Sequence, residues 1–199
     1  MDLISEGYLQ CMREKHEVDP ESKAPAWGQT GHRYAGKWVR GIIEEYDIKT
    51  ALDYGCGKGT LSGFLPQVEW TNYDPGVEEF STFPTGQFDM VVSSDVLEHI
   101  EPPYLDNVLD AMRSLTRDVL AADIPTEPTG NKLHTGPYRG SDEHLTVERA
   151  EWWAERFKHH DFEMIYARNE PVTLRYANGT PKPGPKRVRA RLLFRRGVR

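Results

Sequence analysis

The chain has 199 residues, of which 38% are hydrophobic and 28% are charged. This size predicts one soluble domain with a single core, and no apolar run approaches the ~18 residues that a membrane-spanning helix needs. With no signal-peptide core and no metal-ligand spacing around the two cysteines, Cys11 and Cys56, the protein is expected in the cytoplasm. The formal net charge is −6, yet residues 181–199 contain eight Lys and Arg residues and no acid.

The N-terminal residues 1–26 are predicted to form a helix and a linker outside the main domain. Ile4, Tyr8 and Met12 fit one face of a short amphipathic helix, and a polar, proline-containing stretch follows. The main domain is predicted to cover 27–199. Its first helix is indicated by apolar residues at four-residue spacing, which are Tyr34, Trp38, Ile42 and Tyr46.

Strand and helix patterns then alternate, which predicts an α/β fold with a single doubly wound, mostly parallel sheet. The predicted strands are Ala51–Tyr54, Glu69–Tyr73, Phe88–Ser93, Val119–Asp123, Phe162–Ala167 and Val188–Phe194. A helix is expected to begin at Pro102 and Pro103, and another is expected after Thr146 as its N-cap. The last strand alternates apolar residues with arginines, so one face is expected to be buried and the other basic.

The segment after the first strand contains three glycines, Gly55, Gly57 and Gly59. Glycines at a strand-to-helix turn allow a sharp bend and a close approach of a ligand to the main chain. A P-loop would need Ser or Thr after Lys58, where Gly59 stands, and a dinucleotide fingerprint would need glycine at Thr60. Both alternatives fail at a defining position.

The pattern from Asp53 to Gly59 resembles motif I of the class I, Rossmann-like methyltransferases that use S-adenosylmethionine. The resemblance implies that Asp53 holds the methionine amino group and that Asp74, at the end of the second strand, binds the ribose hydroxyls. It also places Ser94 and Asp95, from the block Phe88–Ile100, at the methionine end. The implied cofactor-binding residues are Asp53, Gly55, Cys56, Gly57, Asp74, Ser94 and Asp95.

The resemblance covers about residues 27–199 and extends to small methyltransferase-domain proteins encoded by bacteriophages. One departure is visible between Pro75 and Asp89, where only 13 residues replace the helix and strand that family members usually have. The third-strand region is therefore expected to be abbreviated, and the adenine pocket to be built differently, around Phe80 to Phe83. The last strand is expected to be antiparallel, as in the class.

Methyl transfer from a sulfonium is an in-line displacement on an activated donor, so proximity and alignment dominate. A base is needed when the acceptor carries a proton, and the candidates are Glu98, His99 and His144, with His134 as a further histidine. The block from Asp95 to His99 together with His144 also resembles the magnesium site of small-RNA and ubiquinone-pathway O-methyltransferases. A divalent metal, Mg or Mn, is an open alternative for these residues.

The expected acceptor is a small molecule or a carbohydrate, methylated on O or N, with nucleic-acid hydroxyls as the second class. The long segment from Pro125 to Leu145 is predicted to cover the acceptor. The C-terminal arginines either contact phosphates of nucleic acid or form a solvated strand face. In the class that the chain resembles, the last strand lies inside the sheet, which implies that such an arginine row needs acidic partners or a ligand beside it. A non-catalytic S-adenosylmethionine-binding module is the alternative function, and neither the acceptor nor the oligomeric state follows from the sequence.

Overall fold

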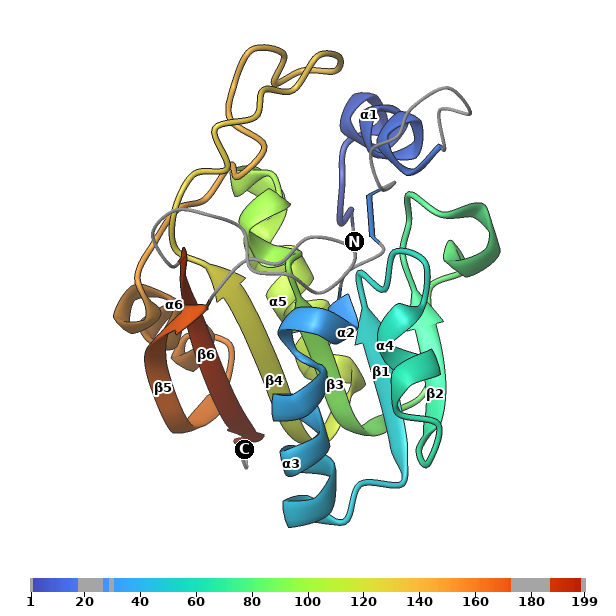
Figure 1. The fold of residues 1–199 in the computed structure, drawn as a ribbon, viewed down its shortest axis with the longest axis vertical. Coiled ribbons are helices and arrows are strands. Elements are labelled where there is room, and N and C mark those ends of the chain that lie inside the picture. Colours follow the sequence, from blue (N-terminus) through green and yellow to red (C-terminus); the bar gives the residue numbers. More distant parts are fainter. Residues whose placement is uncertain (1, 18–26, 29–30, 173–186, 198–199) are drawn as a thin grey trace.

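A computed structural model describes residues 2–17, 27–28, 31–172 and 187–197. Six strands form one sheet in the order β2-β1-β3-β4-β6-β5, and only β6 runs antiparallel to its neighbours. The strands are β1 (Thr50–Tyr54), β2 (Glu69–Tyr73), β3 (Phe88–Ser94), β4 (Thr116–Pro125), β5 (Phe162–Val172) and β6 (Arg187–Arg196). The predicted mostly parallel sheet with an antiparallel last strand is confirmed (Figure 1).

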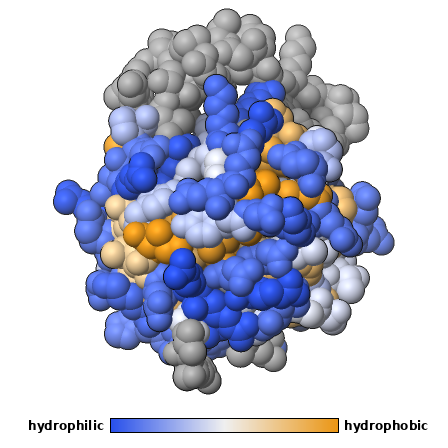
Figure 2. Space-filling view, turned by 90° about the horizontal axis from the view of Figure 1, so that it is seen from below, coloured by the Kyte–Doolittle hydropathy of each residue, from blue (hydrophilic) through white to orange (hydrophobic). Residues whose placement is uncertain are grey.

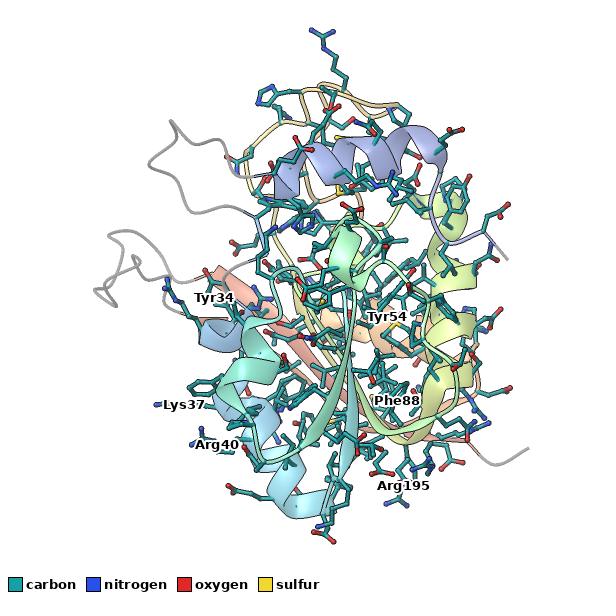
Figure 3. All side chains as sticks on the ribbon, turned by 90° about the vertical axis from the view of Figure 1, so that its right-hand side faces the viewer. Tyr34, Lys37, Arg40, Tyr54, Phe88 and Arg195 are labelled. Carbon is teal, nitrogen blue, oxygen red and sulfur yellow. The ribbon has the colours of Figure 1, made fainter. Side chains whose placement is uncertain are left out.

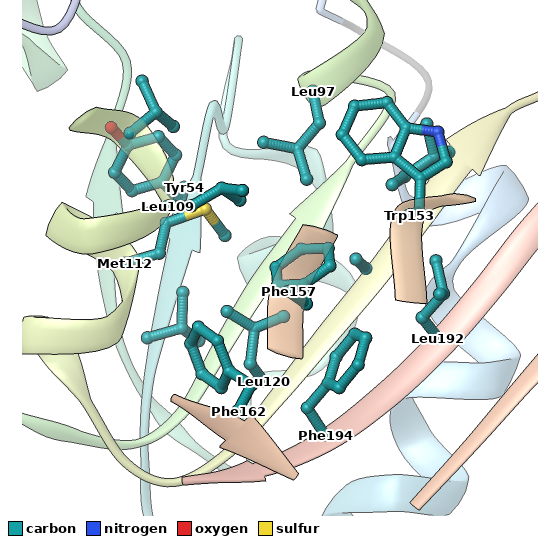
Figure 4. Close-up of a cluster of buried hydrophobic side chains, with 14 of the residues drawn as sticks. Tyr54, Leu97, Leu109, Met112, Leu120, Trp153, Phe157, Phe162, Leu192 and Phe194 are labelled. Atoms are coloured by element: carbon teal, nitrogen blue, oxygen red, sulfur yellow. The ribbon is translucent and has the colours of Figure 1, made fainter. Parts of the chain in front are cut away.

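Helices cover both faces of the sheet, as expected for a doubly wound fold (Figure 1). One face packs on α3 (Gly36–Tyr46) and α4 (Thr60–Phe64), and the other on α5 (Leu105–Leu115) and α6 (Ala150–Lys158). Successive strand residues point to opposite faces, so Leu52 joins the α5 and α6 side while Ala51 joins the α3 and α4 side. Figure 4 shows the larger of the two cores, with Trp153 and Phe157 packed on the sheet.

The predicted abbreviation after the second strand is confirmed. Between β2 and β3 the chain forms only the short 3-10 helix η1 (Glu78–Phe80), so the sheet ends at β2 in the described part of the chain. Pro102 and Pro103 begin the short helix η3 (Pro102–Tyr104), which leads directly into α5 as predicted. None of the described helices combines the length and the apolar character needed to cross a membrane.

Two helix starts differ from the prediction. Tyr34 ends a separate short helix, α2 (Gly31–Tyr34), and α3 begins only at Gly36. Thr146 is not an N-cap, because α6 begins at Ala150 with Arg149 before it. The N–H groups of Leu145 and Thr146 instead donate to the carbonyl of Glu98, at 2.7 and 3.0 Å, which holds this stretch extended across the sheet end.

The N-terminal helix α1 (Glu6–His16) lies above the carboxyl ends of the parallel strands (Figure 1). Its N-cap is Ser5, whose hydroxyl accepts a hydrogen bond from the N–H of Tyr8. Tyr8, Cys11 and Met12 form a small apolar cluster with Leu133 of the long segment that follows β4. The helix therefore packs against the main domain, while the predicted linker over 18–26 lies outside the described residues and the boundary at residue 26 stays a prediction.

Candidate functional site

A cavity of about 350 Å³ lies where the carboxyl ends of β1 and β3 meet α1. Such a volume is typical of a small-ligand site, and this end of an open α/β sheet is where ligands usually bind. All seven residues predicted to bind the cofactor line it, as do His99 and His144. The apolar part of the lining includes Leu3, Ile4, Met12, Trp27, Ile100 and Val108.

The glycine loop takes the predicted sharp turn. Gly55, Gly57 and Gly59 all have positive φ, at 79°, 54° and 65°. A Cβ on Gly55 would lie 2.3 Å from a methyl of Val96, and one on Gly57 would lie 2.4 Å from the Cα of Gly28. These glycines are therefore required by the protein's own packing, since any side chain would collide as well as strain the backbone.

Two carboxylates lie beside this loop at the ends of β1 and β2. Asp74 accepts hydrogen bonds from the N–H groups of Gly57 and Gly76, both at 2.9 Å, so it fixes the loop. Asp53 is 4% exposed, and burial together with the neighbouring Asp74 raises its pKa to about 7. A cationic group placed in the cavity would favour the ionised form of Asp53.

Cys56 and Ser94 are also buried in the cavity wall. Burial raises the pKa of the Cys56 thiol above its usual range, so the thiol stays protonated and unreactive. The Ser94 hydroxyl lies 3.4 Å from Oδ2 of Asp123, a fully buried residue of β4. Both residues therefore form small polar parts of the cavity wall, and neither is placed to act as a nucleophile.

Arg189 of β6 ties the cavity wall to the sheet. Its Nε lies 3.0 Å from both carboxylate oxygens of Asp123, and its Nη1 donates to Asp95 at 2.9 Å. Burial alone would raise the pKa of Asp95, but the charge of Arg189 lowers it. Arg189 is only 5% exposed and Arg191 pairs with Glu170, so the expectation of one solvated basic face on this strand is wrong for these two residues. The rings of Tyr34 and Trp38 lie over Arg189 and Arg191, respectively, and the acids beside the two arginines compensate their burial.

Glu98, His99 and His144 come together beneath the cavity wall. The Nε2 atoms of His99 and His144 lie 3.7 and 3.9 Å from Oε1 of Glu98. Burial and the nearby Asp95 raise the pKa of Glu98 well above its usual range, while burial lowers the pKa of His99 to about 4. His99 is therefore neutral at physiological pH. His134, the further histidine, is exposed on the long segment and does not contribute to the described lining.

A roof covers the cavity, formed by α1 and residues 126–149, which we call the roof segment (Figure 1). The hydroxyl of Tyr8 donates to the carbonyl of His99 at 2.8 Å, and Lys15 pairs with Glu143 of the roof segment. Ser5 is bound to Glu101 through both its N–H and its hydroxyl. Thr129, Asn131, Glu143 and His144 bring the roof segment into the lining, whereas the predicted adenine region, Phe80 to Phe83, does not reach it.

Several lining residues were not predicted. Trp27 packs on His99 with ring centroids 4.7 Å apart, and Gly28 crosses the glycine loop, where its carbonyl accepts from the N–H of Lys58. His16, at the end of α1, lies 3.8 Å from Asp74. The polar residues of α1 carry no spacing that points to a site, so only the packing of α1 on the loop identifies them.

The chain is similar to known proteins of one family. A family model described as a methyltransferase domain matches residues 14–167. No curated protein matches the chain.

Many solved structures share the fold. The 1,6-didemethyltoxoflavin-N1-methyltransferase of Burkholderia thailandensis is similar over 100% of this chain and 93% of its own, with a TM-score of 0.62 and 14% identity. The N-methyltransferase NodS of Bradyrhizobium japonicum is similar over 97% and 100%, with a TM-score of 0.61 and 14% identity. The magnesium protoporphyrin IX methyltransferase of Synechocystis has a TM-score of 0.59, 14% identity and coverages of 96% and 95%.

At these identities the likeness establishes the fold, and the family match over residues 14–167 establishes the kind of enzyme. The chain belongs to the methyltransferase-domain family and is an enzyme that takes its methyl group from S-adenosylmethionine.

Proposed function

We propose that this methyltransferase modifies an oxygen or nitrogen atom of a small-molecule or carbohydrate-like acceptor that binds beneath α1 and the roof segment. The observation that carries the proposal is the single cavity, which is lined by the glycine loop on one side and by His99 and His144 on the other. Donor and acceptor would therefore share one enclosed space, and in-line transfer needs that proximity.

S-adenosylmethionine would bind in the part of the cavity formed by the carboxyl ends of β1, β2 and β3. Asp53 would hold the methionine ammonium, because its buried carboxyl, with a pKa near 7, becomes fully ionised beside a cation. Asp74 would accept the ribose hydroxyls through the lone pairs that the N–H groups of Gly57 and Gly76 leave free. Ser94 and Asp95 would lie beside the methionine end, and the backbone of Gly55 to Gly57 along the cofactor.

S-adenosylmethionine supplies an activated methyl group when bound, so the chain's own residues need to orient the acceptor and exclude water. The neutral imidazole of His99 and the imidazole of His144 would face the acceptor atom, with Glu98 behind them. When no metal ion occupies these side chains, an acceptor that carries a proton would pass it to Nε2 of one of the two histidines. The roof, held by Tyr8 and Lys15, would keep water from the reacting atoms.

A small acceptor is favoured over a nucleic-acid hydroxyl by the roof and by the arginines. Leu3, Ile4 and Met12 of the N-terminal segment narrow the cavity with apolar side chains. Arg189 and Arg191, which could otherwise contact phosphates, are bound to Asp123, Asp95 and Glu170 inside the protein. The resemblance to bacteriophage-encoded proteins stays a prediction and has no part in this argument.

Two measurements test the proposal. Calorimetry should detect one equivalent of S-adenosylmethionine and no binding of NAD; the opposite ligand preference would overturn the assignment of the site. Incubation with labelled S-adenosylmethionine and pooled small metabolites should then incorporate label, whereas incorporation only into nucleic acid would move the acceptor to the second class. Binding without incorporation into either pool would favour the non-catalytic module.

A further inference from the structure

Three potential ligand atoms converge under the cavity, one each from Glu98, His99 and His144, and all lie within 4.8 Å of one another. The two Nε2 atoms lie 3.7 and 3.9 Å from Oε1 of Glu98, which is too long for a hydrogen bond. With metal–ligand bonds of about 2.0 to 2.2 Å, neighbouring ligands of one ion lie roughly 3 to 3.5 Å apart. The two Glu98–histidine pairs would need to close by a few tenths of an ångström, and the widest pair, at up to 4.8 Å, by about 1 to 2 Å.

Both histidines are held in the tautomer that a metal ligand requires. Nδ1 of His99 lies 2.8 Å from the carbonyl oxygen of Glu143, and Nδ1 of His144 lies 2.6 Å from that of Glu127. A carbonyl only accepts, so Nδ1 donates in each ring and the lone pair of each Nε2 faces Glu98. Metal-binding histidines are typically oriented in this way, by donating their other ring N–H to a backbone or side-chain oxygen.

The carboxyl group of Glu98 is buried beside that of Asp95, another acid. The side chain is 0% exposed, and no N–H or O–H group of the described residues donates to Oε1 or Oε2. A buried acceptor without a donor is costly, and a buried carboxylate more so. Arg189, the neighbouring cation, donates its hydrogen bonds to Asp123 and Asp95 rather than to Glu98.

We propose that Glu98, His99 and His144 bind one divalent transition-metal ion. Two imidazole nitrogens and one carboxylate suit zinc, cobalt, iron or manganese, whereas magnesium prefers oxygen ligands and water. Asp95 is not among the converging ligand atoms, and its Oδ1 accepts from Arg189. The site therefore differs from the four-residue magnesium arrangement that the sequence alone left open.

The ion would have free coordination positions on the cavity side, because His99 and His144 line the cavity and Glu98 lies behind them. An acceptor with two adjacent oxygen or nitrogen donors, such as a vicinal diol, a catechol or a hydroxy acid, would fit those positions. This consequence for the acceptor rests on the proposed methyl transfer, whereas the metal site does not.

The test is a titration of chelator-treated, tag-free protein with Co²⁺, Zn²⁺, Mn²⁺ and Mg²⁺. Calorimetry should give one equivalent, with Zn²⁺ and Co²⁺ binding more tightly than Mn²⁺ and Mg²⁺ weakest. Bound Co²⁺ should produce a visible absorption band and quench the emission of Trp27, whose ring contacts His99. The proposal would be overturned if no ion bound at the highest metal concentration, or if Mg²⁺ bound most tightly.

Matched variants assign the site. Glu98→Gln and His144→Ala should each weaken Co²⁺ binding by at least about 100-fold. His134→Ala, which removes an exposed histidine of the same roof segment, should leave it unchanged. Binding of S-adenosylmethionine by each variant shows that it is folded and is measured separately, so loss of metal alone is distinguishable from failure of the methyltransferase assignment. Unchanged Co²⁺ affinity in both folded ligand variants would contradict the site.

Discussion

Charged residues are mostly exposed at the amino end of the sheet and mostly buried at its carboxyl end. At the amino end, Asp89 pairs with Arg117 and Asp47 with Lys49, and Arg117, Lys49 and Asp47 are largely exposed. Figure 2, which views that end, shows a mostly hydrophilic surface crossed by a band of hydrophobic residues. At the carboxyl end, Asp53, Glu98 and Asp123 are buried. Burying a charge is costly unless it is compensated, so the carboxyl end is where this chain maintains polar groups for binding and chemistry rather than for stability.

The largest expected effect is a difference in stability loss between two arginine substitutions, one at each end of the sheet, that each remove the partner of an aspartate. Arg189→Met should lower the free energy of unfolding by about 3 to 5 kcal/mol, because it leaves the buried Asp123 with only the longer 3.5 Å contact to Arg191 and removes the cation beside Asp95. Arg117→Met at the other end should lower it by less than about 1 kcal/mol, since that pair is solvated. Urea unfolding of both variants measures the difference. Equal losses would mean that the two ends do not differ in this respect.

A second comparison uses aspartates at opposite ends of neighbouring strands. Asp53→Asn should weaken S-adenosylmethionine binding by about 10- to 100-fold, the usual value of a hydrogen bond to a charged group, and Asp89→Asn should leave the affinity unchanged. Calorimetry measures both. If Asp89→Asn weakened binding as much as Asp53→Asn, the assignment of Asp53 to the ligand would be wrong.

The pH dependence of the same residue follows from its pKa of about 7. A carboxyl with a higher pKa in the folded state binds more protons there, so its contribution lowers the stability of the unliganded protein as the pH rises from about 4 towards 7. A bound ammonium favours the ionised form, so cofactor binding at pH 6 should release a proton. Calorimetry in buffers of different ionisation enthalpy detects that proton, and it should be absent in Asp53→Asn.

The smallest expected effect concerns the roof. Ser5→Ala removes the N-cap of α1 and the hydroxyl bonded to Glu101, and it should lower the free energy of unfolding by about 1 kcal/mol. Ser114→Ala at the amino end removes a hydroxyl that only returns to the carbonyl of Ala111, so it should change stability by less than about 0.5 kcal/mol. Thermal unfolding of the two variants measures the loss of stability of each. A larger loss for Ser114→Ala would reverse it.

Much of this fold could be predicted because local patterns determine it. All six strands fall where alternating or continuous apolar residues placed them, and the shortened path after Tyr73 was visible from a residue count. The apolar and charged residues of these patterns are also separated in space: in Figure 3, Tyr54 lies in the interior and Lys37, Arg40 and Arg195 lie on the outside. The start of α6 could not be predicted, because the carbonyl of Glu98 holds Thr146 from 48 residues away along the chain.

The site was predictable only where a motif lies within one segment. The glycine loop, Asp74 and the block around His99 lie in contiguous stretches, so each could be recognised alone. The resemblance implied acidic partners for arginines on an inner strand, but not which acids, because the partners of Arg189, Asp95 and Asp123, are more than 60 residues distant. The contacts of Trp27, Gly28 and His16 with the site likewise depend on tertiary packing, which carries no local pattern.

The shortened path between β2 and β3 also makes β2 the edge of the sheet within the described chain. An edge strand presents a row of unpaired backbone groups to which a further strand can add. β2 is only five residues long and begins with an exposed glutamate, and both features disfavour pairing with another chain. The same edge lies next to Asp74, the residue proposed to bind the ribose, so residues grafted into 77–87 could extend the sheet and reshape the cavity in one step.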